Sequence, residues 1–307
     1  MCLGFAALAS FSFRRRAPTQ AQCPAMNYKH IYHAGNFADV AKHAGLLYCL
    51  DALKRKDAGF FVLDSHSGRG FYDLQAPEVQ KSGEAERGVQ RLIVNALGAP
   101  VLADYFAAIR ARRGKRLPRY PGSPALIASS LRTQDRAVFV ELMPAEARAA
   151  EREIESVGRV TSEIGDGYAA LKAFLPPEER RGLVLIDPPY ESLDELKTML
   201  RAFADAYRRW PSGIFLMWYP IRSAAQRSMV HTRFEALRIP KMLFADLAIH
   251  PDDAGVGLAG SGLMIVNPPY GADAYLREAY AAIHGGIAAP GSGYVEVARL
   301  TPERMAQ

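Results

Sequence analysis

Short apolar runs separated by segments of helical length constrain the fold of this chain more than any other feature. Each run is bounded by turn residues, a pattern that predicts βα units and a mostly parallel sheet. Seven strands are expected, at Phe60–Asp64, Ala137–Leu142, Arg159–Ile164, Leu183–Asp187, Gly213–Trp218, Met242–Ile249 and Gly262–Val266. Helices are expected at about 38–56, 145–156, 192–210, 223–237 and 272–284. The chain is therefore expected to form an α/β fold around one main sheet.

The first 25 residues are set apart from this fold. They begin with an apolar stretch, continue with three arginines at positions 14–16 and contain no acidic residue. A secretory signal carries its positive charge before the apolar stretch, so the order here is reversed. A start at Met26 explains the segment most simply, as an untranslated or disordered extension of a domain spanning residues 26–307. An organelle transit peptide is the alternative.

The interval between the first two expected strands, residues 71–136, is much longer than an ordinary crossover. It predicts an inserted, mostly helical subdomain at about 71–118. A basic cluster without any acid stands at its end and consists of Arg110, Arg112, Arg113, Lys115, Arg116 and Arg119. Such a cluster suits either contacts with nucleic-acid phosphates or the solvated end of a helix.

The charge, the cysteines and the hydropathy limit the function classes. Half of the net charge of +6 lies in residues 1–25, so the total charge does not by itself identify a nucleic-acid partner. Cys2, Cys23 and Cys49 have no metal-ligand spacing and cannot all pair, which favours a reducing compartment and no bound metal. No apolar run reaches the roughly 20 residues of a membrane span. We therefore expect a cytoplasmic protein, and nothing in the sequence demands more than a monomer.

Turn residues or acids follow the first three expected strands. The first strand leads into Asp64-Ser65-His66-Ser67-Gly68-Arg69-Gly70, whose small residues let backbone approach a ligand closely. Glu141 ends the second strand, where a carboxylate can accept both hydroxyls of a ribose. Gly165-Asp166-Gly167 follows the third, and its carboxylate suits either a tight turn or an adenine amino group. Each feature alone also fits an ordinary strand end, but the series together indicates a bound adenosyl group.

The fourth strand carries the most specific signal, Leu-Val-Leu-Ile-Asp-Pro-Pro-Tyr at residues 183–190. The two prolines stop the strand and remove two N–H donors. The Asp187 carboxylate and the Pro188 carbonyl then offer two acceptors to an exocyclic amine, and the Tyr190 ring can stack on its base. Asp187 can also take a proton from the amine as positive charge develops on the nitrogen. A proline-rich loop after a core strand is the plain alternative.

A second motif of the same kind, Asn-Pro-Pro-Tyr, occupies residues 267–270. A neutral Asn267 amide cannot take up the proton that the amine must lose. This motif also follows the seventh expected strand, which should lie near the antiparallel edge of the sheet and end at its opposite side. We therefore expect Asp187, and not Asn267, to be the catalytic residue.

The chain resembles the bacterial 23S rRNA (adenine(2030)-N6)-methyltransferase family, RlmJ, from Tyr28 to about Val297. The resemblance rests on Tyr28-Lys29-His30, His33–His43, Asp64–Gly70, Tyr120–Pro124, Glu141, Asp166-Gly167, Asp187–Tyr190, Trp218-Tyr219-Pro220 and Gly262–Pro269. It implies a Rossmann-like, seven-stranded methyltransferase sheet that uses S-adenosylmethionine to methylate N6 of an adenine in 23S rRNA. The adenine would be flipped into the pocket of Asp187.

The resemblance also implies roles for individual residues. The implied contacts with S-adenosylmethionine are His43, His66, Ser123, Glu141, Asp166, Gly167 and Asp187, and Asp187 would also be the proton acceptor. The implied contacts with the RNA are Tyr28 and Lys42, to which the argument from chemistry adds Pro188 and Tyr190 at the base and Arg112, Arg113 and Arg116 at the phosphates.

Two other functions remain open on the sequence. A DNA adenine-N6 methyltransferase would use the same chemistry, but it usually carries a large recognition domain near the Asp-Pro-Pro-Tyr strand, where this chain has only residues 167–182. An inactive RNA-binding module on the same fold would be expected to lose Glu141, Asp166 or Asp187, and all three are present. The expected partner is 23S rRNA, either free of protein or in an early assembly intermediate.

Overall fold

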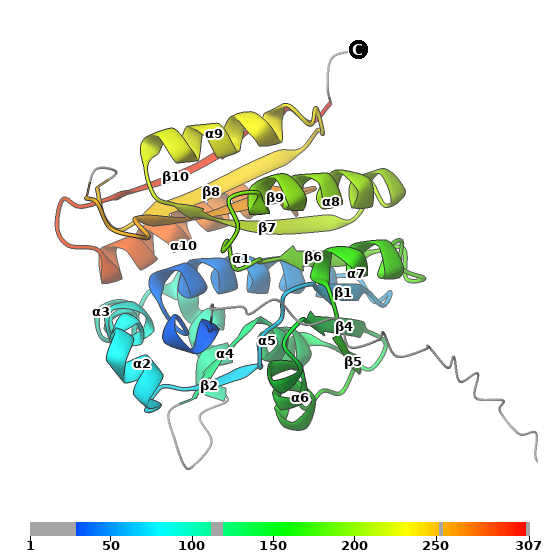
Figure 1. The fold of residues 1–307 in the computed structure, drawn as a ribbon, viewed down its shortest axis with the longest axis horizontal. Coiled ribbons are helices and arrows are strands. Elements are labelled where there is room, and N and C mark those ends of the chain that lie inside the picture. Colours follow the sequence, from blue (N-terminus) through cyan, green and yellow to red (C-terminus); the bar gives the residue numbers. More distant parts are fainter. Residues whose placement is uncertain (1–28, 112–118, 252–253, 305–307) are drawn as a thin grey trace, which may run out of the picture.

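The computed structural model describes residues 29–111, 119–251 and 254–304, and its centre is a sheet of eight strands. The strand order is β10-β8-β9-β7-β6-β1-β4-β5 (Figure 1). The strands are β1 (Phe61–Asp64), β4 (Arg136–Glu141), β5 (Arg159–Ile164), β6 (Gly182–Ile186), β7 (Ile214–Ile221), β8 (Met242–Ala248), β9 (Gly260–Val266) and β10 (Tyr294–Arg299). All seven expected strands are present, and β10 is an additional one, so the expected Rossmann-like α/β fold is confirmed.

Five neighbouring strands, β7, β6, β1, β4 and β5, run parallel to one another. The strand β9 lies between β7 and β8 and runs antiparallel to both, and β10 pairs antiparallel with β8 at the edge. The expectation that the seventh strand lies near the edge is therefore corrected: β9 is inside the sheet, because β8 and the unforeseen β10 close the sheet beyond it.

Helices cover both faces of the sheet, as parallel strands require. One face packs on α1 (Phe37–Lys54), α5 (Ser123–Ser130) and α10 (Ala272–Ile287). The other packs on α7 (Gly167–Phe174), α8 (Glu195–Arg209) and α9 (Ala224–Glu235), while α6 (Pro144–Glu153) packs on β4 and β5. The five helices expected from the sequence are all present within a few residues of their expected bounds. No helix among the described residues is long and apolar enough to cross a membrane.

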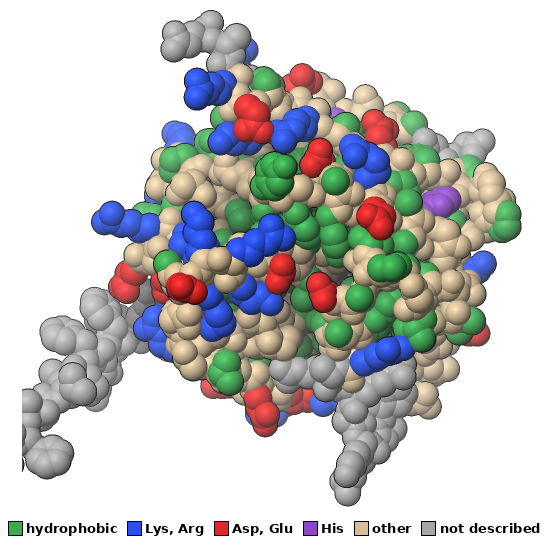
Figure 2. Space-filling view, turned by 180° about the vertical axis from the view of Figure 1, so that it is seen from behind, with side chains coloured by type: hydrophobic (Ala, Val, Ile, Leu, Met, Phe, Trp, Pro, Cys, Tyr) green, Lys and Arg blue, Asp and Glu red, His purple; other side chains and the backbone are tan. Residues whose placement is uncertain are grey.

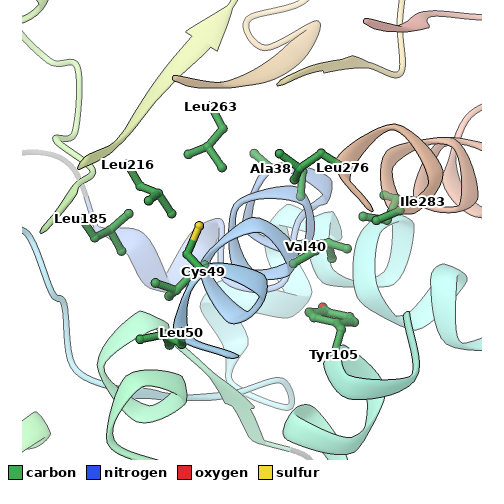
Figure 3. Packing of buried hydrophobic residues seen from close by; sticks show 14 of the residues in the cluster. Ala38, Val40, Cys49, Leu50, Tyr105, Leu185, Leu216, Leu263, Leu276 and Ile283 are labelled. Carbon is green, nitrogen blue, oxygen red and sulfur yellow. The ribbon is translucent and has the colours of Figure 1, made fainter. Parts of the chain in front are cut away.

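The helix α1 is buried on nearly every side, as Figure 3 shows. Its Val40, Cys49 and Leu50 lie among leucines of β6, β7 and β9 and side chains of α4 and α10. Asn36 caps the helix by accepting a hydrogen bond from the Asp39 N–H. Because the helix is enclosed, polar residues of its first turns are buried as well, and these include Asp39, Lys42 and His43. Such residues require specific partners, which the site below supplies.

The segment expected as a helical insertion begins and ends on a small antiparallel ladder of β2 (Phe71–Asp73) and β3 (Arg119–Pro121). Between them lie short helical elements: α2 (Pro77–Ser82), η2 (Glu86–Gln90), α3 (Arg91–Ala96), η3 (Pro100–Leu102) and α4 (Ala103–Ala111). Figure 1 shows α2, α3 and α4 gathered around the beginning of α1. Their buried residues belong to the same hydrophobic cluster as α1, so the segment is packed into the main core.

Candidate active site at the carboxyl ends of the central strands

Four acidic residues lie along one edge of the sheet. Asp64 ends β1, Glu141 ends β4, Asp166 follows β5 and Asp187 follows β6. These four strands are consecutive and parallel, in the order β6-β1-β4-β5, so their carboxyl ends meet at the same edge. The strand that carries Asp187 is adjacent to β1, as the sequence predicted. Acids expected to act together are therefore neighbours in space.

Asp187 forms an ion pair with Lys42 of α1. The Lys42 Nζ also donates to Asp39 Oδ1 at 2.9 Å, and the side chains of Asp39, Lys42 and Asp187 are 3%, 5% and 14% exposed. Burial alone would lower the pKa of Lys42, but Asp187 and Asp39 together raise it above its usual value. Burial alone would raise the pKa of Asp39, but Lys42 and His30 hold it well below its usual value. The lysine is thus a buried cation between two carboxylates.

The ring of Tyr190 is fixed beside Asp187. Its φ of 52° lies in the left-handed region that non-glycine residues rarely adopt, a conformation that persists only where the surroundings impose it. The Tyr190 hydroxyl donates to the Trp218 carbonyl oxygen at 2.9 Å, and the two rings meet edge to face at 5.6 Å. Pro188 is buried, while Pro189, Tyr190 and Trp218 line a cavity that also contains Asp187. The motif therefore presents a carboxylate and an aromatic ring to one space.

Glu141 holds the glycine-rich turn after β1. Its Oε2 accepts a hydrogen bond from the Gly68 N–H at 2.9 Å, and its Oε1 accepts one from the Met143 N–H at 2.7 Å. Burial raises the pKa of Glu141, although both N–H donors act in the opposite direction. Each carboxylate oxygen keeps a second acceptor position for a ligand. This structural role was not evident in the sequence.

Asp166 and Gly167 form the beginning of α7. Asp166 caps that helix by accepting a hydrogen bond from the Tyr168 N–H at 2.7 Å. A β-carbon on Gly167 would collide with the Ser65 carbonyl oxygen, so only glycine fits there. His66 lies against the same junction, and burial lowers its pKa to about 4, so its ring is neutral near pH 7. The turns after β1 and β5 are therefore in direct contact.

Asp64, Ser123 and His43 are buried polar residues in the interior of the site. The Ser123 hydroxyl donates to Asp64 Oδ2 at 2.6 Å, and burial raises the pKa of Asp64 to about 7. His43 Nδ1 hydrogen-bonds the Tyr120 hydroxyl at 2.9 Å, and burial lowers the pKa of His43 to about 3. Asp64 was not among the predicted site residues, although its place at the end of the first strand, directly before the small-residue turn, was an available signal.

Two buried acceptor atoms of the turn after β1 lack a hydrogen-bond partner among the described residues, Asp64 Oδ1 and Ser67 Oγ. Buried polar atoms are nearly always paired, so these two unpaired atoms suit a ligand that brings donors. With the carboxylates of Glu141 and Asp166, the edge of the sheet offers several acceptors to a ligand rich in N–H and O–H groups. No group of three or more His, Cys, Asp or Glu suited to a metal occurs among the described residues.

The remaining predicted site residues have different outcomes. Tyr28, Arg112, Arg113 and Arg116 lie outside the described residues. Of their neighbours in the basic cluster, Arg110 is exposed on α4, and Arg119 forms an ion pair with Glu153 and lies over the Phe71 ring. Figure 2 shows lysine and arginine mainly on the left half of the face it presents, with acidic side chains among them. Charge alone therefore does not outline a binding surface on this face.

The second motif is remote from this site. Asn267 follows β9, which runs antiparallel to β7, and its Nδ2 donates to the Pro211 and Gly213 carbonyl oxygens at 2.8 Å each. Those carbonyls precede β7, at the opposite end of the sheet from Asp187. The expectation that the two motifs face opposite ways is confirmed, and Asn267 has a local structural role.

The chain is similar to several known proteins. The family described as "Ribosomal RNA large subunit methyltransferase D, RlmJ" matches residues 57–301. The chain is 38% identical to the ribosomal RNA large subunit methyltransferase J of Haemophilus influenzae and 35% identical to that of Escherichia coli K12, each over 91% of this chain and all of the relative. A solved structure of a Legionella pneumophila protein superposes with a TM-score of 0.80 at 32% identity, over 87% of this chain and 98% of that one.

Proposed function

The chain belongs to the RlmJ family of ribosomal RNA large subunit methyltransferases, and from that premise we propose that it methylates N6 of one adenine in 23S rRNA with S-adenosylmethionine as the donor. The target would be the adenine equivalent to position 2030. The observation that carries the proposal is the Asp187-Pro188-Pro189-Tyr190 turn at the end of β6, next to β1, opening into a cavity of about 690 Å³.

The chemistry of this turn suits an aromatic amine. The Asp187 carboxylate and the Pro188 carbonyl accept the two N6 hydrogens and thereby orient the amino group. The Tyr190 ring, fixed by Trp218, stacks on the adenine, which must first be flipped out of its strand. Asp187 accepts the proton that N6 loses as the new C–N bond forms.

The residues at the carboxyl ends of β1, β4 and β5 fit S-adenosylmethionine. When bound, this cofactor supplies an electrophilic methyl group on a sulfonium, and transfer leaves S-adenosylhomocysteine. Its hydroxyl, amino and ammonium groups are donors, which match the unpaired Asp64 Oδ1 and the acceptors of Glu141 and Asp166. The residues that would hold it are His43, His66, Ser123, Glu141, Asp166, Gly167 and Asp187.

Lys42 serves Asp187 directly in this scheme. As a buried cation in contact with the carboxylate, it fixes the position of Asp187 and balances its charge. It also lines the cavity, so it lies beside the space that the base would occupy. Tyr28, Arg112, Arg113 and Arg116 remain proposed RNA contacts. We further propose that the protein acts in the cytoplasm as a monomer, on rRNA that is free of protein or at an early stage of assembly.

Transfer of labelled methyl groups to three substrates tests this function. Protein-free 23S rRNA, assembled large subunits and duplex DNA are incubated in parallel with labelled S-adenosylmethionine, and the modified nucleoside is identified after digestion. We expect N6-methyladenosine at one site in the protein-free RNA. Equal labelling of DNA would favour a DNA methyltransferase. RNA binding without any transfer would indicate an inactive module and overturn the proposal.

A further inference from the structure

The cavity that contains Asp187 extends well beyond the space of one base. Its volume of about 690 Å³ is in the range that encloses a whole drug-sized ligand. Asp187, Tyr190 and Trp218 form one part of its wall. Other parts of the wall come from residues 30–42 at the beginning of α1, from the insertion at residues 84–91, from residues 249–258 and from the end of α10 at residues 287–289. The outer part is therefore available to the nucleotides attached to a flipped base.

The net charge of the side chains that line this cavity changes from negative in its buried part to positive in its outer part. Its buried part contains two carboxylates around one lysine, Asp39, Asp187 and Lys42, which leaves one net negative charge. Its outer part carries three arginines and two glutamates, which are Arg87, Arg91, Arg222, Glu84 and Glu191. The outer part is thus net positive. A flipped nucleotide has the complementary arrangement, since its amine-bearing base goes in and its phosphates stay outside.

Arg91 and Arg222 stand out among these charges. Both are exposed, and neither guanidinium has an ion pair or a side-chain hydrogen bond with another residue of the described chain. Arg91 begins α3 in the insertion, whereas Arg222 directly follows β7 and lies close enough to influence the Tyr190 hydroxyl electrostatically. Arg87, by contrast, already donates to the Ser82 carbonyl oxygen. Two uncommitted guanidinium groups therefore border the cavity from different elements.

We propose that Arg91 and Arg222 bind the backbone phosphates on either side of the flipped adenosine, an assignment that rests on the proposed function. A guanidinium binds a phosphate through two parallel N–H donors, which fixes its position as well as its charge. Such contacts set the register of the strand and carry no base information. The two arginines act as positioning residues, and selection of the adenine is left to the turn around Asp187.

The variants Arg91→Ala and Arg222→Ala, singly and together, test the proposal. Both side chains are exposed and have no ion pair or side-chain hydrogen bond within the described part of the chain, so the variants should melt like the wild type. Loss of a charge-assisted contact should raise the KM for RNA about 10-fold per arginine while kcat at saturating RNA is retained. Each variant should also lower the salt slope of RNA binding by about one. Affinity for S-adenosylmethionine should not change.

Control variants make the result specific. Arg233→Ala removes an exposed arginine from α9, outside the cavity, and should leave KM and the salt slope unchanged. Arg222→Lys keeps the charge but not the paired donors, so it should fall between the wild type and Arg222→Ala. The triple variant of Arg112, Arg113 and Arg116 tests the competing path over the basic cluster.

The outcomes separate this inference from the function on which it rests. If the wild type transfers no methyl group to RNA, the proposed function fails. If the wild type is active and the Arg91 and Arg222 variants behave like Arg233→Ala, the function stands and the arginine assignment is overturned. A loss confined to the triple variant would likewise overturn it, because the phosphates would then follow the basic cluster.

Discussion

Replacing Asp187 with asparagine removes proton acceptance while preserving the shape of the side chain. The asparagine keeps one oxygen acceptor and nearly the same volume. Lys42 loses one of its two carboxylate partners, but Asp39 remains 2.9 Å from its Nζ, so the buried ammonium stays compensated. The cost in stability should therefore fall well below the roughly 3–5 kcal/mol of a buried charge left alone. The variant should fold.

The expected effect on activity is far larger. A positioned proton acceptor contributes roughly 10²- to 10⁴-fold to a rate, equivalent to about 3–5 kcal/mol in the activation barrier. The asparagine amide would also turn a donor toward Lys42 or the substrate amine in one of its orientations. We therefore expect kcat on 23S rRNA to fall at least 100-fold, while the melting temperature and the affinity for S-adenosylmethionine change little.

Single-turnover methyl transfer, thermal melting and calorimetric titration of the cofactor measure these three quantities. Asn267→Ala is the matched control, because it changes the second Asp/Asn-Pro-Pro-Tyr motif. It deletes two hydrogen bonds to backbone carbonyls, so it should lose about 1–3 kcal/mol of stability and keep most of its activity. An active Asp187→Asn enzyme, or an inactive but folded Asn267→Ala enzyme, would refute the assignment.

Substitutions at three further residues probe other parts of the site. Glu141→Ala should weaken S-adenosylmethionine binding by about 1.5–3 kcal/mol, since it removes charged acceptors and frees the turn after β1; unchanged affinity in calorimetry would take Glu141 out of the site. Burial raises the pKa of Asp64 to about 7, above about 3.9 in the unfolded chain, so the folded state holds an extra proton and the free energy of unfolding declines as pH rises between these values. Asp64→Asn should flatten this decline in urea unfolding at about pH 5 and pH 8, and an identical pH dependence in both proteins would argue against the buried carboxyl. Tyr190→Phe should stay active because only the hydroxyl's bonds to the Trp218 carbonyl oxygen and the Met199 sulfur are lost, whereas Tyr190→Ala should lose about 10- to 100-fold in kcat/KM with the stacking ring; equal activity of the two would show that the ring does not stack on the base.

The sequence did not predict β2, β3 and β10, whose pairing partners are distant in the chain. The strand β10 has mixed exposure at the edge of the sheet, and it forms because β8 offers it an open side. The short β2 and β3 pair across the whole insertion and have too few residues for a visible pattern. The position of β9 inside the sheet depends on its pairing with both β7 and β8, which the order of the strands along the chain does not reveal.

The fold class could be predicted from the amino-acid sequence, as could the adjacency of the strands that carry Asp187 and the glycine turn, and the opposite orientation of Asn267. These follow from local physics: buried parallel strands are continuous apolar runs, and prolines, glycines and acids mark where they end. Only the tertiary structure joined Lys42 to Asp187, the Glu141 carboxylate to the Gly68 N–H, and Ser123 to Asp64. The partners in each pair are at least 59 residues apart. Their contact depends on packing α1 and the strands against one another, because a buried charge takes its partner from whatever the fold brings within reach.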